Sequence, residues 1–230
     1  MPSNLVDYDH VAGVSIGAIN ASIFSTFPRG HEQEAVDKIT ELYTTYTTAD
    51  LFSFYTPMIL APFKHNSMAD FSPCMEVLRK TLADRPFQRK VSLLTCDLNT
   101  AQPLILDETM SNEERIELII ASASIPFAFQ PREIEDMFLV DGGMFSNVAI
   151  GDPIERCREE GFADEDIIVD VLLCYESPWV MDEWDSENLQ WQTAWDFYQR
   201  RHAISKFYFN TEEVQRLYRG YDGINFRLII

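Results

Sequence analysis

Residues 11–21, VAGVSIGAINA, decide the fold prediction for this chain. The segment contains the pattern G-x-S-x-G, preceded by a short strand-like run and followed by small and apolar residues at helical spacing. In that context the pattern places a serine hydroxyl on a sharp strand-to-helix turn, and we expect crowding there to require both Gly13 and Gly17. The turn also puts Ser15 at a helix N-terminus, where free N–H groups favour developing negative charge. The segment therefore predicts a nucleophilic serine in an α/β fold; the alternative is a glycine-flanked turn with a surface serine.

Strand and helix patterns alternate along the rest of the chain. Strands are predicted at residues 9–14, 90–96, 102–106, 138–140, 167–175 and 224–230. Helices are predicted at residues 16–27, 32–46, 71–82, 112–124, 153–160 and 188–204, with a helical turn at 211–219. Residues 167–175 form a continuous β-branched run, as expected of a strand buried on both faces. The alternation predicts one layered α/β domain over residues 1–230, around a mostly parallel sheet.

Composition and charge exclude several classes of protein. With 18 Lys and Arg against 37 Asp and Glu, the net charge is −19. Such a surface repels phosphate backbones and anionic membranes, which excludes nucleic acid as a partner and docking through a basic patch. The polar start and the lack of a transmembrane-length apolar run predict a cytoplasmic protein. Cys96 and Cys174 lie in apolar runs that predict buried strands, which favours reduced, structural cysteines.

The histidines are poor partners for Ser15. A Ser–Asp–His hydrolase of the α/β type needs several strands before its serine, with the acid and then the histidine after it. Only 14 residues precede Ser15, which leaves room for one strand. Three histidines precede any suitable acid and the fourth falls in a helix pattern among arginines; they are His10, His31, His65 and His202. We therefore interpret them as solvated or core histidines.

Asp141 is the better candidate to activate the serine. The segment FLVDGG, residues 138–143, ends an apolar strand with a carboxylate in front of Gly142 and Gly143. Strand ends in open α/β sheets are where ligand sites form. A carboxylate partly shielded from water there can take a proton directly from a serine hydroxyl. The alternative interpretation is a turn-forming Asp-Gly pair.

Three motifs in this order resemble the patatin-like phospholipases, a family of lipid acyl hydrolases with a Ser–Asp dyad. They are the nucleophile segment 13–21, the stretch ASASIPFAFQP at residues 121–131, and DGG at 141–143 followed by Asn147. The likeness covers about residues 9–160, and residues 161–230 are expected to extend the same domain. The resemblance implies a three-layer α/β/α fold without metal or organic cofactor. It also implies that Ser15 is the nucleophile, Asp141 its base and the Ile16 N–H an oxyanion donor.

The sequence departs from the family pattern at two places. Family members begin with a strand and a glycine-rich loop whose N–H groups supply the oxyanion hole, and residues 1–10 contain no such loop. Losing one preorganised donor costs about 3 kcal/mol of transition-state stabilisation. Either the chain begins after its loop, or it is a family member with impaired or lost catalysis. In addition, Ala149 replaces the usual proline two residues after Asn147.

The expected function is hydrolysis of a lipid or other acyl ester through an acyl-serine intermediate. One alternative is a catalytically silent patatin-like module with a structural or lipid-binding role. Acyl transfer to an alcohol other than water is a second enzymatic alternative. The acidic surface implies that any contact with a membrane or lipid interface is transient and apolar, made near Ser15. The apolar residues 51–60 either line an acyl-chain pocket or belong to the core, in a segment expected to be loop or broken helix because of Pro57 and Pro62.

Overall fold

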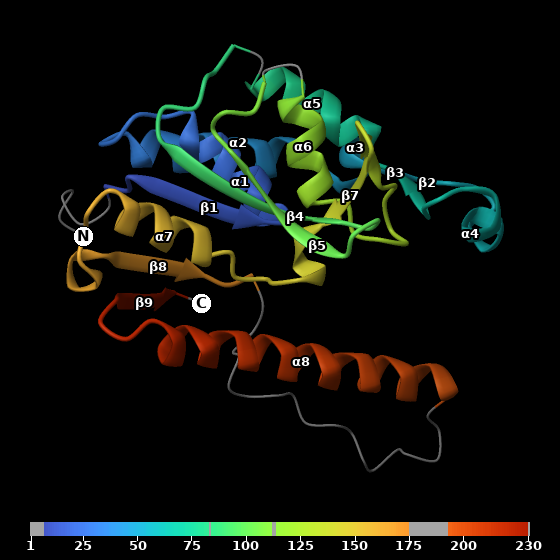
Figure 1. The fold of residues 1–230 in the computed structure, drawn as a ribbon. Helices are drawn as coiled ribbons and strands as arrows, with labels where there is room; N and C mark the ends of the chain where they lie inside the picture. Colours follow the sequence, from blue (N-terminus) through green and yellow to red (C-terminus); the bar gives the residue numbers. More distant parts are fainter. Residues whose placement is uncertain (1–6, 83, 112–113, 175–192, 230) are drawn as a thin grey trace. The chain divides into compact units, whose positions relative to one another are not determined.

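Strands and helices alternate along the chain, as the sequence predicts (Figure 1). The computed structural model describes residues 7–82, 84–111, 114–174 and 193–229, in two compact units, Met1–Glu155 and Arg156–Ile230. The strands of the first unit are β1 (His10–Val14), β2 (Ser53–Phe54), β3 (Ala69–Asp70), β4 (Lys90–Asp97), β5 (Gln102–Asp107), β6 (Arg132–Ile134) and β7 (Met137–Asp141). Its helices are α1 (Ile16–Ser25), α2 (Glu32–Thr45), α3 (Thr48–Leu51), α4 (Ala61–Lys64), α5 (Ser72–Leu82), α6 (Arg115–Ser122) and the 3₁₀ turns η1 (Met58–Leu60) and η2 (Gly142–Met144). Helix α7 (Gly151–Glu159) begins in the first unit and ends in the second.

Strand β4 organises the sheet that positions the candidate site. Its first half pairs in parallel with β1, with Leu94 opposite Val14, and its second half pairs antiparallel with β7, with Thr95 opposite Asp141. Strand β5 pairs with β4 along both halves, so it occupies the other edge. Strands β1 and β7 therefore share one edge of β4, and their carboxyl ends meet between Leu94 and Thr95.

The mostly parallel sheet expected from the sequence is found only in part. Parallel pairing joins β1 to β4, whereas β5, β6 and β7 pair antiparallel. Short connections account for two of these pairs: β4 and β5 are joined by residues 98–101, and β6 and β7 by residues 135–136, which suffices only for hairpins. The long connection through α1, α2 and α5 brings β4 back parallel to β1.

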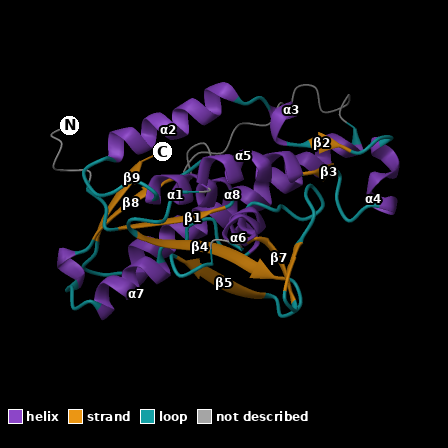
Figure 2. Ribbon diagram, turned by 90° about the horizontal axis from the view of Figure 1, so that it is seen from above, coloured by secondary structure: helices purple, strands orange, loops and turns teal. Residues whose placement is uncertain are grey.

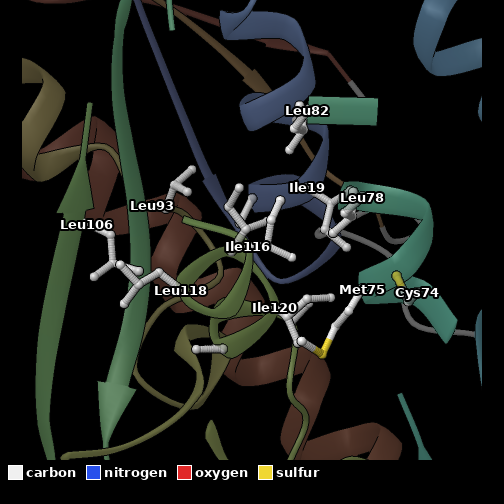
Figure 3. Close-up of a cluster of buried hydrophobic side chains, with 14 of the residues drawn as sticks. Ile19, Cys74, Met75, Leu78, Leu82, Leu93, Leu106, Ile116, Leu118 and Ile120 are labelled. Atoms are coloured by element: carbon white, nitrogen blue, oxygen red, sulfur yellow. The ribbon is translucent and has the colours of Figure 1, made fainter. Parts of the chain in front are cut away.

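The main core lies between the sheet and helices α1, α5 and α6 (Figure 3). Val91 and Leu93 of β4 point into this core, where they join Ile19, Leu78 and Ile119. Alternate residues of a strand point to opposite faces, so the intervening Ser92 points to the other side of the sheet. There its hydroxyl donates to Asp152 in the first turn of α7. Figure 2 shows the same elements from above.

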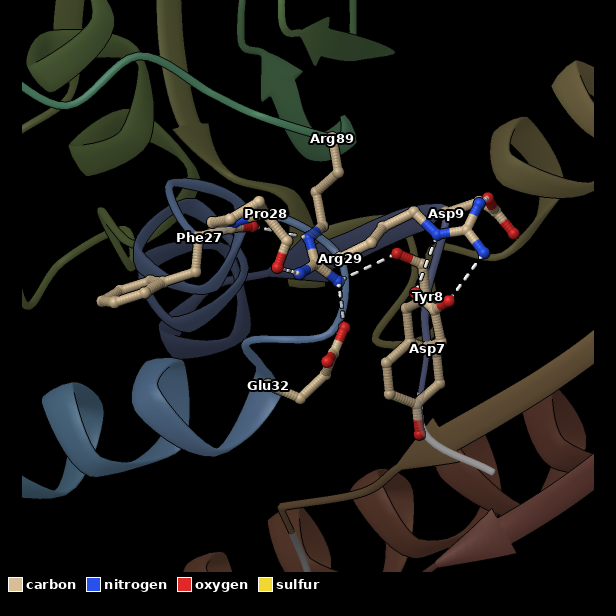
Figure 4. Close-up of polar contacts among 8 residues, drawn as sticks. All are labelled: Asp7, Tyr8, Asp9, Phe27, Pro28, Arg29, Glu32 and Arg89. Atoms are coloured by element: carbon tan, nitrogen blue, oxygen red, sulfur yellow. Dashed lines mark hydrogen bonds and ion pairs between the residues drawn. The ribbon is translucent and has the colours of Figure 1, made fainter. Parts of the chain in front are cut away.

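A buried arginine fixes the segments on either side of β1 and α1 (Figure 4). The Arg89 guanidinium donates to the carbonyls of Tyr8, Phe27 and Pro28 at 2.8, 3.0 and 2.7 Å. It also donates to the Glu32 carboxylate at 2.9 Å, and the Arg89 side chain is 1% exposed. Because these carbonyls lie before β1 and after α1, Arg89 holds both ends of the strand–turn–helix that carries Ser15.

The second unit holds a small sheet and a long helix, and it corrects three predictions. Strand β8 (Ile168–Leu172) pairs in parallel with β9 (Asn225–Ile229), and within the described residues these two strands form a sheet of their own. For that reason Ile168 and Leu172 are 59% and 73% exposed, not buried on both faces, and Cys174 is exposed as well. Helix α8 (Ala194–Gly220) replaces the predicted helix and separate turn, while residues 188–192 lie outside the described part. None of the described helices is long and apolar enough to cross a membrane.

Candidate active site

The serine turn, residues 13–17, is the sharp connection between β1 and α1. Ser15 lies between the two elements with φ 57° and ψ −128°, a conformation that residues other than glycine rarely adopt. Its side chain makes no hydrogen bond that caps α1, so the hydroxyl is directed elsewhere. This is the strained strand-to-helix turn that the G-x-S-x-G pattern predicts.

The two glycines of this turn differ in what the structure demands of them. A Cβ atom on Gly13 would lie 2.2 Å from the carbonyl oxygen of Gly17 and 2.7 Å from the nitrogen of Ala18. A Cβ atom on Gly17 would have no atom within 4 Å. The expectation that crowding requires glycine on both sides of Ser15 therefore holds for Gly13 and is wrong for Gly17.

The aspartate turn, residues 141–143, ends β7 and faces the serine turn. The carboxyl of Asp141 accepts a hydrogen bond of 2.6 Å from the Ser15 hydroxyl at Oδ2, and one of 2.7 Å from the Gly143 N–H at Oδ1. Asp141 is 4% exposed. A Cβ on Gly142 would lie 2.2 Å from the carbonyl oxygen of Leu94, so glycine allows the turn to approach β4.

Burial determines the electrostatics of this pair. It raises the pKa of Asp141 above the ordinary aspartate range, because the charged carboxylate loses contact with water. Hydrogen bonds from Ser15 and Gly143 act in the opposite direction, since both donate to the charged form. A carboxylate with a raised pKa that already holds the serine hydroxyl is a stronger base than an exposed aspartate.

Ser122 joins the two turns, and the sequence analysis assigned it no role. Its fully buried hydroxyl accepts from the Ser15 N–H at 3.2 Å and donates to the Leu94 carbonyl at 2.6 Å. Two residues later, the Ser124 carbonyl accepts from the Asp141 N–H at 3.0 Å. The ASASIP motif thus contacts the backbone of both turns. The motif was recognisable in the sequence. The role of Ser122 was not, because its contact with Ser15 joins residues 107 positions apart and depends on the three-dimensional fold.

Ile16 and Asn147 lie beside the pair. Ile16 is the first residue of α1 and follows Ser15 directly, so its N–H has no acceptor within the helix. Asn147 packs against the aspartate turn, because a Cβ on Gly143 would come within 2.7 Å of its Oδ1. Residues 1–10 contain no glycine-rich loop of the kind in the family pattern. Residues 1–6 of this segment lie outside the described part.

The described histidines do not contact the Ser15 hydroxyl. In the described part of the chain, no histidine hydrogen-bonds Ser15; the imidazole Nε2 of His10 lies 2.7 Å from the Ser92 hydroxyl instead. Among these residues there is also no group of three or more His, Cys, Asp or Glu side chains placed to hold a metal ion. The chemistry that the described arrangement offers is a proton transfer between a hydroxyl and a carboxylate.

The fold and the site together define an α/β protein built around a G-x-S-x-G serine whose hydroxyl is bound to a buried aspartate. The family model for patatin-like phospholipases matches residues 2–154, which is more than half of the chain. The chain therefore belongs to the patatin-like phospholipase family, which confirms the resemblance inferred from its motifs. Members of this family are lipid acyl hydrolases with a three-layer α/β/α fold. A search of curated proteins gave no match.

Proposed function

We propose that this protein hydrolyses carboxylic esters of lipids, with Ser15 as the nucleophile and Asp141 as the general acid–base. The observation that carries the proposal is the 2.6 Å hydrogen bond from the Ser15 hydroxyl to a buried carboxylate 126 residues away. Membership in the family supplies the substrate class at a general level. The strained Ser15 backbone supports it further, because such strain persists where the surrounding structure maintains it, commonly at active sites.

In the first half of the reaction Ser15 becomes acylated. The Asp141 carboxylate takes the hydroxyl proton while Ser15 Oγ forms a bond to the ester carbonyl carbon, whose oxygen becomes negative. The tetrahedral intermediate then collapses: the bond from carbon to the leaving oxygen breaks, and Asp141 returns its proton to that oxygen. An alcohol departs, and the acyl group stays on Ser15.

In the second half water releases the acyl group. Asp141 takes a proton from a water molecule as the water oxygen attacks the acyl carbon, and the proton returns to Ser15 Oγ as the bond to carbon breaks. In both halves the negative oxygen forms next to the N-terminus of α1. The N–H of Ile16 and the helix dipole there favour negative charge, which supports its role as an oxyanion donor.

Release of free fatty acid from phosphatidylcholine and from a soluble short-chain ester tests the proposal. We expect the wild-type protein to hydrolyse both esters and Ser15→Ala to lose on the order of 10⁶-fold in kcat, since it lacks the attacking oxygen. Ser205→Ala is the matched control, because Ser205 is an exposed serine of α8, outside the serine and aspartate turns. Wild-type activity in this control ties the loss to Ser15.

The same assay separates the alternatives. A folded wild-type chain that releases no fatty acid from either ester would contradict the proposal and favour a silent module. Fatty acid that appears on an added alcohol rather than in free form would identify acyl transfer. Hydrolysis that survives in Ser15→Ala would place the chemistry at another residue.

A further inference from the structure

Residues 51–68 carry a cluster of exposed apolar side chains at one end of the first unit. Phe63 of α4 is 84% exposed, and Phe54, Met58 and Leu60 are 53%, 50% and 40% exposed. Figures 1 and 2 both show β2, β3 and α4 at the edge of this unit, beyond α3. The elements here are short, with 2 to 4 residues each, as expected of a segment interrupted by two prolines. Exposed apolar side chains grouped in this way mark contact surfaces rather than ordinary protein surface.

The segment also differs in charge from the rest of the chain. Between Asp50 and Asp70 there are 19 residues with no acidic side chain, and Lys64 is the one charged residue. At the frequency of the whole chain, 37 acids in 230 residues, such a stretch would hold about three. A protein with a net charge of −19 thus presents one strongly apolar segment without negative charge. That combination suits an uncharged or zwitterionic lipid surface, where binding comes from buried apolar area and not from attraction between charges.

An apolar cavity lies at the base of the segment. It has a volume of about 330 Å³, in the range of small-molecule sites. Phe52, Phe54 and Met68 line it from the segment, and Phe127 and Phe129 from the loop after α6. Its walls are apolar, as an acyl chain requires.

The loop that lines this cavity also contacts the candidate catalytic pair. The Met68 N–H donates to the Phe127 carbonyl at 2.9 Å, and the Asp141 N–H donates to the Ser124 carbonyl at 3.0 Å. Phe127 follows Ser124 by three positions, and three extended residues span at most about 11 Å. The exposed segment, the cavity and the aspartate turn are therefore joined by one short loop.

We propose that residues 51–68 are a docking segment that places the protein on a zwitterionic or uncharged lipid surface, with the cavity at its base receiving an acyl chain. Phe63, Met58 and Leu60 enter the interfacial layer of the lipid, and Phe54 lies where the exposed cluster meets the cavity. The docking step rests on the proposed function only in its purpose, which is to bring an acyl ester to Ser15. Binding to lipid itself requires no chemistry at the serine.

Flotation with phosphatidylcholine vesicles tests the docking segment with the full chain. We expect Phe63→Asp to weaken vesicle binding at least about tenfold, because it removes apolar area and adds a charge at the interface. Phe162→Asp is the matched control: Phe162 is a phenylalanine that is 53% exposed outside the segment, and its substitution leaves binding at the wild-type level. Circular dichroism checks that both variants fold. We also expect binding to persist at high salt, because attraction between charges does not contribute. Binding should be weaker on vesicles that contain phosphatidylserine, because an anionic surface repels a chain with a net charge of −19.

Three results would overturn the proposal: no vesicle binding by the wild-type chain, equal loss in the two variants, or binding that high salt abolishes. A change of oligomeric state in Phe63→Asp by light scattering, with vesicle binding unchanged, would instead identify the cluster as an interface between copies of this chain.

Measuring vesicle binding in Ser15→Ala separates this inference from the proposed function. Vesicle binding that depends on Phe63 in a protein without hydrolysis would uphold the docking segment and contradict the enzymatic proposal. Hydrolysis by a protein whose vesicle binding does not depend on Phe63 would uphold the enzymatic proposal and contradict the docking segment.

Discussion

The serine turn and the aspartate turn lie at the same edge of β4, yet each holds its functional group at a different energetic cost. At the serine turn the cost is conformational, because Ser15 has a positive φ while its side chain stays partly accessible. At the aspartate turn the backbone is ordinary, with φ −51° and ψ 123°, and the cost is burial of a carboxylate. The nucleophile is thus held in place by backbone geometry, whereas the basicity of the aspartate is set by its removal from water.

The largest effect that separates the two turns is expected from Asp141→Asn. The amide keeps the shape and can accept from the Gly143 N–H, but it cannot take a proton, so kcat for a soluble ester should fall about 10²- to 10⁴-fold. The same change should raise the free energy of unfolding at neutral pH, because burial disfavours the charged carboxylate.

The size of that stability change depends on pH. The folded-state pKa of Asp141 is raised, so the carboxyl is neutral in both states below about pH 4, and the penalty grows as pH rises from there through the folded-state pKa. Thermal unfolding of both proteins at neutral and acid pH measures this. A stabilisation by Asp141→Asn that did not shrink in acid would show that burial of charge is not its cause.

The glycines that allow close approach give the next largest effect. Gly13→Ala and Gly142→Ala each place a Cβ 2.2 Å from a main-chain oxygen, so the backbone must shift. We expect each to lower the free energy of unfolding by about 1–3 kcal/mol in denaturant titrations, with loss of ester hydrolysis. Wild-type stability in either variant would contradict the close packing of that turn on its neighbour.

Ser122→Ala tests the connection between the turns. It removes the acceptor of the Ser15 N–H, and we expect kcat to fall about tenfold with little change in KM, since the serine turn loses one net hydrogen bond. Ser124→Ala is the matched control: Ser124 is equally buried, but its hydroxyl donates to the Ile120 carbonyl within its own helical region. Equal losses of kcat in both variants would indicate a general packing effect and remove the positioning role of Ser122.

The smallest effect is expected from Gly17→Ala. A Cβ there meets no atom within 4 Å, and alanine is favoured over glycine in a helix. The free energy of unfolding should therefore rise by about 0.5–1 kcal/mol, in contrast to Gly13→Ala in the same turn. A destabilisation similar to that of Gly13→Ala would show that both sides of Ser15 are crowded after all.

Local patterns in the sequence predicted most elements because the periodicity of apolar residues depends on local backbone geometry. The boundaries of α1, α2, α5 and β4 lie within two residues of those predicted. Pairing direction was harder, since β7 pairs antiparallel with β4 although β5, α6 and β6 lie between them in the chain. The exposure of β8 was mispredicted because a β-branched run does not reveal how many strands flank it.

The candidate site shows the same division between local and long-range information. The G-x-S-x-G pattern predicted the serine turn, and the DGG motif indicated Asp141 as the candidate base. That the two turns face each other depends on β1 and β7 sharing one edge of β4, which no local pattern encodes. The bridging role of Ser122 depends on the same arrangement, so it too required the three-dimensional structure.

The pairing of Ser15 with Asp141 is tested most directly by the rate at which a fluorophosphonate labels Ser15 across pH, with the adduct located by peptide mass spectrometry. We expect the adduct on Ser15, a rate that falls in acid with a midpoint above the ordinary aspartate range near pH 4, and labelling at least about 10²-fold slower in Asp141→Asn. An adduct on another residue, no adduct on the folded chain, or an unchanged pH profile in Asp141→Asn would contradict the account.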